Sequence, residues 1–143
     1  MSLLVEIKRV RENSLLPEAS GVGYDLFSPE FFILQPMERR LVPTGISIKI
    51  PKGYYGRITS VSGVASKGGV LVLDEIIEPS YRGEVGVTLL NLNLPEDLLA
   101  QRGKALPAIS SLFGPRNAHR VSRGDKVAQI IITQKNILPL KIL

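Results

Sequence analysis

The sequence predicts an all-β fold, either a barrel or a sandwich, on two observations. Short runs of alternating apolar and polar residues recur along most of the 143-residue chain, and Gly, Pro or Asn bounds them. Thirteen glycines and ten prolines supply the turns that so many short strands need. Short strands at this spacing are typical of all-β domains. Because a chain of this length buries most of its apolar surface in one core, a single domain over residues 1–143 is expected.

The predicted strands follow one another through nearly the whole chain. In order, they are LLVEIKRV, GYDLFS, FFILQP, RRLVPTGISIKIP, GRITSV, GGVLVL, GEVGVTLLNL, HRV, KVAQIIIT and ILPLKIL. Two of them are predicted with bounds, from Val85 to Asn91 and from Val127 to Thr133. Between two runs, the segment IPKG is typical of a turn in which Pro51 presets φ and Gly53 takes a positive φ.

One stretch, residues 93–118, departs from the alternating pattern and is expected to be an insertion. Pro95 suits the first helical position, Arg102 the last turn and Gly103 the C-terminal cap. A short helix is therefore predicted near Pro95–Arg102. The stretch is rich in apolar residues, which predicts that it packs on the barrel or on a neighbouring subunit.

The composition excludes several kinds of site. The chain has no cysteine, so a disulfide and a thiolate metal site are both excluded, and its one histidine, His119, excludes a multi-histidine metal site. His119 lies between basic residues and is expected to be a surface or strand-end histidine. The N-terminus lacks the features of a signal peptide and no apolar run reaches membrane-spanning length. A soluble, intracellular protein without a membrane partner is expected.

The net charge of +5 arises from 18 Lys and Arg against 13 Asp and Glu. An excess of positive charge fits polyphosphate or nucleic-acid partners. The basic residues are scattered, however, and the few aromatic residues do not interleave with them as a base-stacking surface would require. Nucleic-acid binding is therefore not favoured.

Five stretches, in this order, resemble the homotrimeric dUTP diphosphatase (dUTPase) family. They are SGVGYDLFS (20–28), LVPTGISIKIPKGYYGRI (41–58), SGVAS (62–66), EPSYRGEVGVTLLN (78–91) and RGDKVAQIII (123–132). The resemblance implies a dUTPase-like, jelly-roll-like barrel that assembles as a homotrimer. It also implies a nucleotide ligand and the hydrolysis of dUTP to dUMP and pyrophosphate, with Mg²⁺ bridging the phosphates.

The resemblance implies roles for five residues. Asp25 takes the place of the aspartate that shapes the catalytic corner, and Ser62 and Gly63 that of a turn whose N–H groups hold the phosphate chain. Tyr81 takes the place of the tyrosine beneath the deoxyribose, and Gln129 that of a phosphate-contacting residue. A structural interpretation stands beside each role. Asp25 and Gly63 suit turns that any such barrel needs, and Tyr81 and Gln129 are equally suited to packing.

Several positions depart from the family's pattern. Val61 stands where the family has a phosphate-binding arginine, and it cannot make a charge-assisted hydrogen bond. Glu78 stands where the family has the aspartate that orients the attacking water, and a shift of about 1 Å in a catalytic group can cost roughly 100-fold in rate. Residues 73–75 replace small residues of the family's β-hairpin, so backbone strain at a positive φ is expected. The family's Gly-rich C-terminal lid is absent from the sequence.

These departures favour a degenerate nucleotide site. The expected function is that of a binding or regulatory module for a nucleotide or an unidentified protein partner, without efficient hydrolysis of dUTP. In that case Glu78 is a solvent-facing remnant above Tyr81. The alternative is an active dUTP diphosphatase that uses Glu78 and Asp25 for catalysis. No resident metal site is expected, and Mg²⁺ is required only if the chain hydrolyses dUTP.

Overall fold

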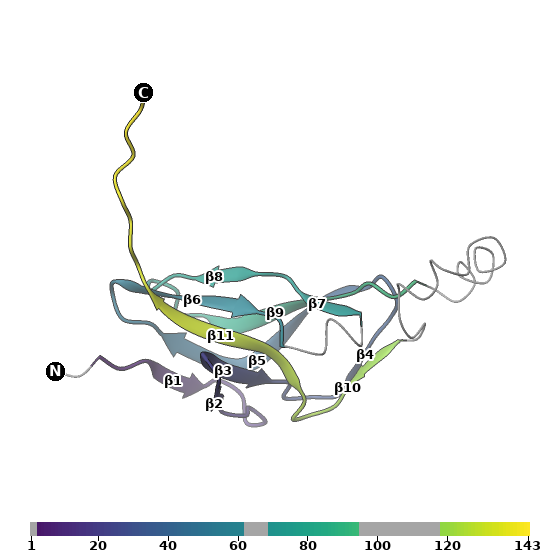
Figure 1. Cartoon of the computed structure of the whole chain (residues 1–143). Helices are drawn as coiled ribbons and strands as arrows, with labels where there is room; N and C mark the ends of the chain where they lie inside the picture. The colour runs from purple at the N-terminus through teal and green to yellow at the C-terminus, as the bar shows by residue number, and fades with distance from the viewer. Residues whose placement is uncertain (1–2, 62–68, 95–117) are drawn as a thin grey trace.

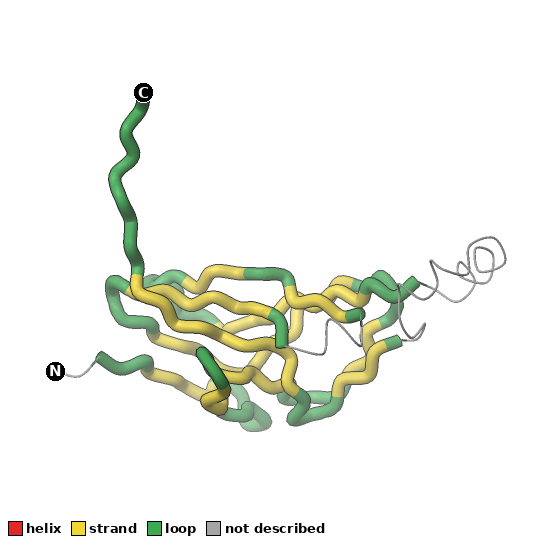
Figure 2. The backbone as a smooth tube through the Cα atoms, viewed as in Figure 1, coloured by secondary structure: helices red, strands yellow, loops and turns green. Residues whose placement is uncertain are grey.

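The computed structural model describes residues 3–61, 69–94 and 118–143, which form three antiparallel sheets and contain no helix (Figures 1 and 2). A four-stranded sheet has the order β1 (Glu6–Arg9), β5 (Arg39–Lys49), β9 (Glu84–Asn91) and β7 (Val70–Val72). A five-stranded sheet has the order β2 (Glu18–Ser20), β3 (Gly23–Phe27), β11 (Lys126–Gln134), β6 (Tyr54–Thr59) and β8 (Glu75–Ile77). A short pair joins β10 (His119–Val121) to β4 (Phe32–Leu34). The all-β prediction is confirmed.

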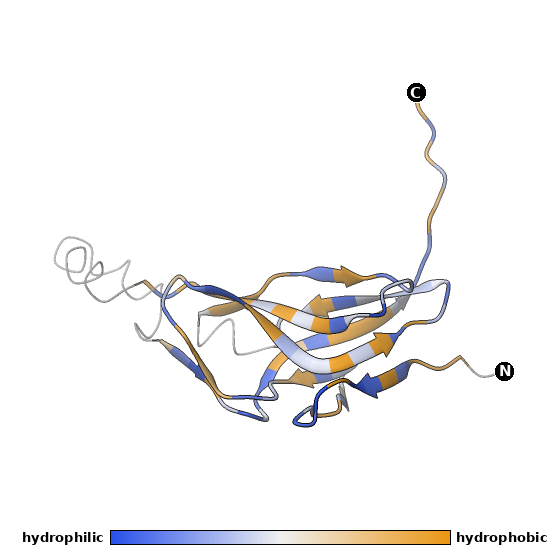
Figure 3. Ribbon diagram, turned by 180° about the vertical axis from the view of Figure 1, so that it is seen from behind, coloured by the Kyte–Doolittle hydropathy of each residue, from blue (hydrophilic) through white to orange (hydrophobic). Residues whose placement is uncertain are grey.

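The apolar core lies between the two larger sheets. Along β9, Val85, Val87 and Leu89 are buried while the residues between them are partly exposed. This period of two is that of a strand with one face in the core. Figure 3 shows hydrophobic and hydrophilic residues following one another along several strands. One buried cluster contains side chains from both sheets, including Ile46 of β5, Ile58 of β6 and Ile130 of β11. The sheets are therefore held face to face by apolar packing.

The two strands predicted with bounds are confirmed, since β9 and β11 each include the predicted residues. The predicted turn before β6 is confirmed as well: Gly53 has a φ of 90°, and its carbonyl accepts a hydrogen bond from the N–H of Lys135 at 2.8 Å. The helix predicted near Pro95–Arg102 lies outside the described residues. Within the described residues, no helix is long and apolar enough to cross a membrane.

The prediction of a strand in ILPLKIL is wrong. Residues 135–143 continue beyond β11 as an extended segment that leaves the body of the molecule and belongs to no strand (Figure 1). Its apolar side chains are exposed, Ile142 to 96%. The residues have the composition of a strand, but a strand needs a hydrogen-bonding partner, and residues 137–143 pair with no strand among the described residues.

The acidic corner, residues 73–75, joins β7 to β8. It crosses from one sheet to the other and does not form the expected β-hairpin. Leu71 pairs with Leu90 of β9 in one sheet, whereas Ile76 pairs with Arg57 of β6 in the other. At the corner, the carboxylate of Asp74 accepts a hydrogen bond from Arg57 Nη2 at 2.7 Å. Among the described residues the only non-glycine with a positive φ is at position 37. The strain expected at residues 73–75 is therefore absent, because a chain that changes sheet needs no left-handed residue here.

Candidate functional site

Strand β11 separates the predicted site residues into two groups. In the middle of its sheet, Gln129 pairs with Asp25 on one side and with Thr59 on the other, and we call Asp25 and Gln129 the Asp25 end. Lys135, which directly follows β11, contacts Glu78, and we call Glu78 and Tyr81 the Tyr81 end. The six residue steps from Gln129 to Lys135 span about 20 Å along an extended strand. Asp25 and Glu78 therefore lie beside different parts of β11.

At the Asp25 end, the polar side chains bind groups of their own chain. The side chain of Asp25 is only 6% exposed, and its Oδ2 lies 3.0 Å from Nζ of Lys126, which is half exposed. The side-chain amide of Gln129 donates a hydrogen bond from Nε2 to the carbonyl of Ser20 at 2.8 Å. These contacts tie β2, β3 and β11 together, and they favour the structural interpretation of both residues.

Val61 lies beside a small cavity where β6 ends. The cavity has a volume of about 10 Å³, which is room for about one water molecule. Apolar side chains such as Val70 and Val127 line it together with His119 and Lys126. His119 is the first residue of β10, so its predicted place at a strand end is confirmed. The cavity is too small for a phosphate group.

Two predicted phosphate-binding residues, Ser62 and Gly63, lie outside the described residues.

A hydrogen-bonded turn forms the Tyr81 end. The N–H of Tyr81 donates to the carbonyl of Glu78 at 3.0 Å. The side chain of Arg82 adds two hydrogen bonds to the turn, since its Nη1 donates to the carbonyl of Tyr81 at 3.1 Å and to that of Pro79. The turn therefore presents Glu78 and Tyr81 from a fixed stretch of backbone that leads directly into β9.

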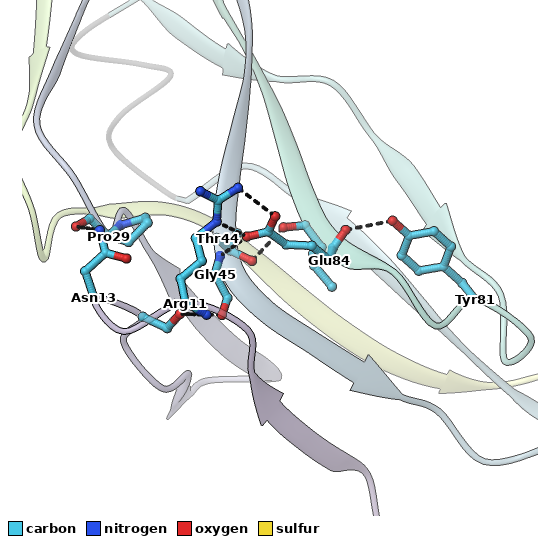
Figure 4. A network of polar contacts seen from close by, with 9 residues as sticks. Arg11, Asn13, Pro29, Thr44, Gly45, Tyr81 and Glu84 are labelled. Atoms are coloured by element: carbon cyan, nitrogen blue, oxygen red, sulfur yellow. Dashed lines mark hydrogen bonds and ion pairs between the residues drawn. The ribbon is translucent and has the colours of Figure 1, made fainter.

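The Tyr81 ring is held over Gly83. Its hydroxyl donates a hydrogen bond to the carbonyl of Glu84 at 2.7 Å, as Figure 4 shows. A Cβ atom at Gly83 would lie 2.7 Å from this hydroxyl oxygen and 2.9 Å from the ring carbon that carries it. Only glycine therefore allows the ring to lie where it does. The side chain remains 43% exposed, which leaves ring surface open to a ligand.

Tyr81 and Glu78 line two different surface hollows. The Tyr81 hollow has a volume of about 350 Å³ and is also lined by Arg11, Leu41, Pro43, Glu75, Glu84 and Gly86. The Glu78 hollow has a volume of about 450 Å³ and is also lined by Tyr55, Ile76, Gln134, Lys135, Asn136 and Ile137. The two sets share no residue. In its hollow, Glu78 lies with Oε2 3.2 Å from Nζ of Lys135.

The predicted exposure of Glu78 is confirmed, since its side chain is 58% exposed. Its expected position above Tyr81 is not found: the carboxylate contacts Lys135, and Glu78 lines the other hollow. Sequence reasoning missed this partner, as it missed Lys126 beside Asp25 and Arg11 beside Glu84. Each of these pairs joins residues far apart in the sequence, and no local spacing relates them.

Acidic and imidazole side chains do not converge into a metal site. Within the described ranges, no group of three or more His, Asp or Glu side chains could hold a metal ion. Magnesium in nucleotide enzymes is often bound through one or two carboxylates and the phosphates of the substrate. With the described side chains, an Mg²⁺ ion would therefore need further ligands, such as the phosphates of a nucleotide.

Comparisons with known proteins agree on one jelly-roll-like class of all-β domain. The dUTPase family model matches residues 15–96. The deoxyuridine 5'-triphosphate nucleotidohydrolase of Wolbachia pipientis subsp. Culex pipiens is 36% identical over 138 residues, which cover 90% of this chain and 76% of the relative. The protein of the same name from Clostridium novyi is 36% identical over 147 residues, covering 99% and 85%. The chain belongs to the dUTPase family.

A solved structure supports the same assignment. A variant of the dUTPase from phage phi11 of S. aureus superposes with a TM-score of 0.76 at 26% identity, covering 98% of this chain and 96% of the phage protein. That structure describes the coordination of a structural Mg(II) ion in the phage enzyme. The similarity extends over almost the whole length of both chains.

Proposed function

We propose that this member of the dUTPase family has a degenerate nucleotide site. It binds a nucleotide weakly, does not hydrolyse dUTP efficiently, and acts as a binding or regulatory module with a protein partner that is still to be identified. The observation that carries the proposal is the separation of Glu78 from Tyr81 into two hollows. A carboxylate that orients an attacking water must stay within hydrogen-bond reach of it, roughly 2.6–3.2 Å, while the substrate is held in line. In this structure the carboxylate of Glu78 instead lies beside Lys135 in the other hollow.

The surroundings of Val61 also support weak handling of phosphate. Val61 lies beside apolar side chains and a cavity of about 10 Å³, where the resembled motif has an arginine. Hydrogen bonds to charged groups contribute about 1.5–3 kcal/mol. A triphosphate therefore loses one of its charge-assisted contacts. Any Mg²⁺ would arrive on the triphosphate, because the described carboxylates form no cluster of three.

A homotrimer is part of the proposal. Gln129 and Lys135, which contacts Glu78, lie about 20 Å apart along β11, and this separation favours a site that takes its two ends from different copies of the chain. Exposed apolar side chains support such an assembly, since large apolar patches mark interaction surfaces. They include Leu41 on β5 and Ile137, Leu140 and Ile142 in the C-terminal segment.

One observation favours a second candidate, an active dUTP diphosphatase. Glu78 is a carboxylate at the position of the family's catalytic aspartate, and it belongs to the same hydrogen-bonded turn as Tyr81. Its partner Lys135 lies at the surface, and exposed ion pairs are weak. Binding of a metal–nucleotide complex would then have to draw the carboxylate back toward Tyr81.

Pyrophosphate release from dUTP with Mg²⁺ distinguishes the two candidates. The proposal expects release close to the rate without protein, the same for the wild type and for Glu78→Ala. Calorimetry with the non-hydrolysable α,β-imido-dUTP should still detect weak binding, and light scattering should give the mass of a trimer. Rapid release that Glu78→Ala abolishes would establish the active enzyme instead. The same assay with other nucleoside triphosphates detects changed specificity.

A further inference from the structure

A paired contact joins the N-terminal segment to the residue that follows the Tyr81 turn. Arg11, in the loop after β1, donates from Nε to Oε1 of Glu84 at 2.6 Å and from Nη2 to Oε2 at 3.0 Å (Figure 4). Two parallel bonds of this kind fix the orientation of both groups, because the guanidinium fork matches the carboxylate. We call this contact the Arg11–Glu84 clamp.

A bulge in β5 anchors the clamp. The pairing of β5 with β9 shifts register between Pro43 and Ser47, and Gly45 within this stretch has a φ of 78°. Such a bulge frees a backbone group from the ladder. Here the N–H of Gly45 donates to Oε1 of Glu84 at 2.9 Å. The side-chain hydrogen bond from Arg11 lowers the pKa of Glu84, and the Gly45 N–H adds to this effect, so the carboxylate stays charged.

The loop that carries Arg11 is itself fixed on Gly45. The N–H of Val10 donates to the carbonyl of Gly45 at 2.9 Å, and the buried hydroxyl of Ser14 donates to the same carbonyl. The N–H of Arg11 donates to the hydroxyl oxygen of Ser14 at 3.2 Å. A side chain at Gly45 would collide with Ser14. The clamp therefore connects two parts of the backbone that are each held in place.

Glu84 links the Arg11–Glu84 clamp to Tyr81. Its side chain is bound by Arg11 and Gly45, and its carbonyl accepts the hydroxyl of Tyr81 at 2.7 Å. The position of that carbonyl, and hence of the ring over Gly83, depends on where the clamp holds the start of β9. Arg11, Glu84 and Tyr81 line the same hollow of about 350 Å³.

We propose that Arg11 and Glu84 are positioning residues that hold the Tyr81 ring as a rigid platform beneath the sugar of the nucleotide, and so set the preference for deoxyribose over ribose. The inference rests on the proposed nucleotide binding at Tyr81. On this proposal, a ring fixed by its hydroxyl excludes an added 2′-hydroxyl, whereas a ring free to shift by about 1 Å admits one. A displacement of about 1 Å can change a rate about 100-fold.

The test compares the dissociation constants of α,β-imido-dUTP and α,β-imido-UTP, both with Mg²⁺, by calorimetry. We expect Arg11→Ala and Glu84→Gln to lower the deoxyribose preference at least about fivefold, and Arg11→Lys to retain part of it, because a single ammonium keeps the charge but not the fork. Tyr81→Phe should lower the preference similarly. The double variant that combines Tyr81→Phe with Arg11→Ala should lose no more of the deoxyribose preference than either single variant, because both substitutions act through the same series of contacts.

The matched control is Arg57→Ala. Arg57 pairs with Asp74 at 2.7 Å, is about as exposed as Arg11, and does not line the Tyr81 hollow. It should change the melting temperature as Arg11→Ala does and leave the sugar preference unchanged. An unchanged preference in Arg11→Ala, or full additivity with Tyr81→Phe, overturns the inference.

A second measurement separates this inference from the proposed function. If the wild type binds neither nucleotide, the nucleotide-binding proposal fails, and NMR of the ligand-free protein still decides the role of the clamp. The ring signals of Tyr81 should shift or broaden in Arg11→Ala and stay unchanged in Arg57→Ala. Ring signals that stay unchanged in both variants overturn the positioning role.

Discussion

The two ends of β11 differ in what their polar atoms bind. At the Asp25 end, the carboxylate of Asp25 and the amide of Gln129 are both engaged by the chain itself. At the Tyr81 end, the chain fixes the backbone and the phenolic hydroxyl of Tyr81 and leaves the ring partly exposed. A retained motif residue thus indicates ligand binding only where part of its side chain is exposed and not already bound by the chain itself. By this criterion Tyr81 is the stronger functional candidate, and Asp25 the stronger structural one.

The largest effect is expected from Asp25→Asn. The side chain of Asp25 is buried and faces Lys126 at 3.0 Å. Loss of its charge should lower the free energy of unfolding by about 1.5–3 kcal/mol, since hydrogen bonds to charged groups are worth this much. Urea denaturation measures the change. The control at the other end, Glu78→Gln, should stay within about 0.5 kcal/mol of the wild type, as exposed sites usually do. Equal losses at both ends would remove the contrast between them.

The next effect concerns phosphate affinity. Val61→Arg introduces a guanidinium at the position where the resembled motif has an arginine. We expect about tenfold tighter binding of α,β-imido-dUTP, which corresponds to one charge-assisted hydrogen bond. Calorimetry measures it, with Val61→Leu as a control that adds bulk without charge. If both variants bind like the wild type, the phosphates lie elsewhere.

A smaller effect is expected from Glu78. Because its carboxylate lines a different hollow from Tyr81, Glu78→Ala should change any residual dUTP turnover by less than about threefold. Glu78→Asp alone should not raise turnover, because Val61 remains. Pyrophosphate release measures both. A hundredfold fall in Glu78→Ala would make the Tyr81 end catalytic and favour the active enzyme.

The smallest effect is expected in the pH dependence of stability. Arg11 lowers the pKa of Glu84 in the folded protein. Its contribution is therefore fully present above the unfolded-state pKa, about 4.3, and is lost as the pH falls through the lower folded-state pKa. The melting temperature should therefore fall less steeply in Glu84→Gln than in the wild type as the pH is lowered from about 6 to about 3. Identical slopes would mean that the clamp does not stabilise the fold.

The strands were predictable because their pattern is local. In β9 buried and partly exposed residues alternate along the whole strand, and β11 holds a run of apolar, mostly β-branched residues. Gly53 was predictable for the same reason, since the preceding proline and the turn specify its conformation. The exposed segment 137–143 shows the limit of this reasoning, because its composition predicts a strand but the described residues provide no strand that pairs with it.

The candidate site was less predictable because its contacts are not local. Family resemblance identified Tyr81 and Asp25, but nothing in the spacing indicated that Arg11 would contact Glu84, 73 residues further along. Nor did it indicate that the acidic corner beside Glu75 would change sheets. Asp74 has a partner in Arg57 only because β8 pairs with β6. Such contacts depend on tertiary pairing, which alternation does not encode.

The separation of the two ends of β11 has a consequence for mixtures of two variants of the chain. If each complete site takes its Asp25 end from one copy and its Tyr81 end from another, a chain altered at Gln129 still supplies an intact Tyr81 end. A chain altered at Tyr81 likewise supplies an intact Asp25 end. Two variants that each lack a complete site alone would then form complete sites when they assemble together. A chain that carries both substitutions would not restore a complete site in either variant.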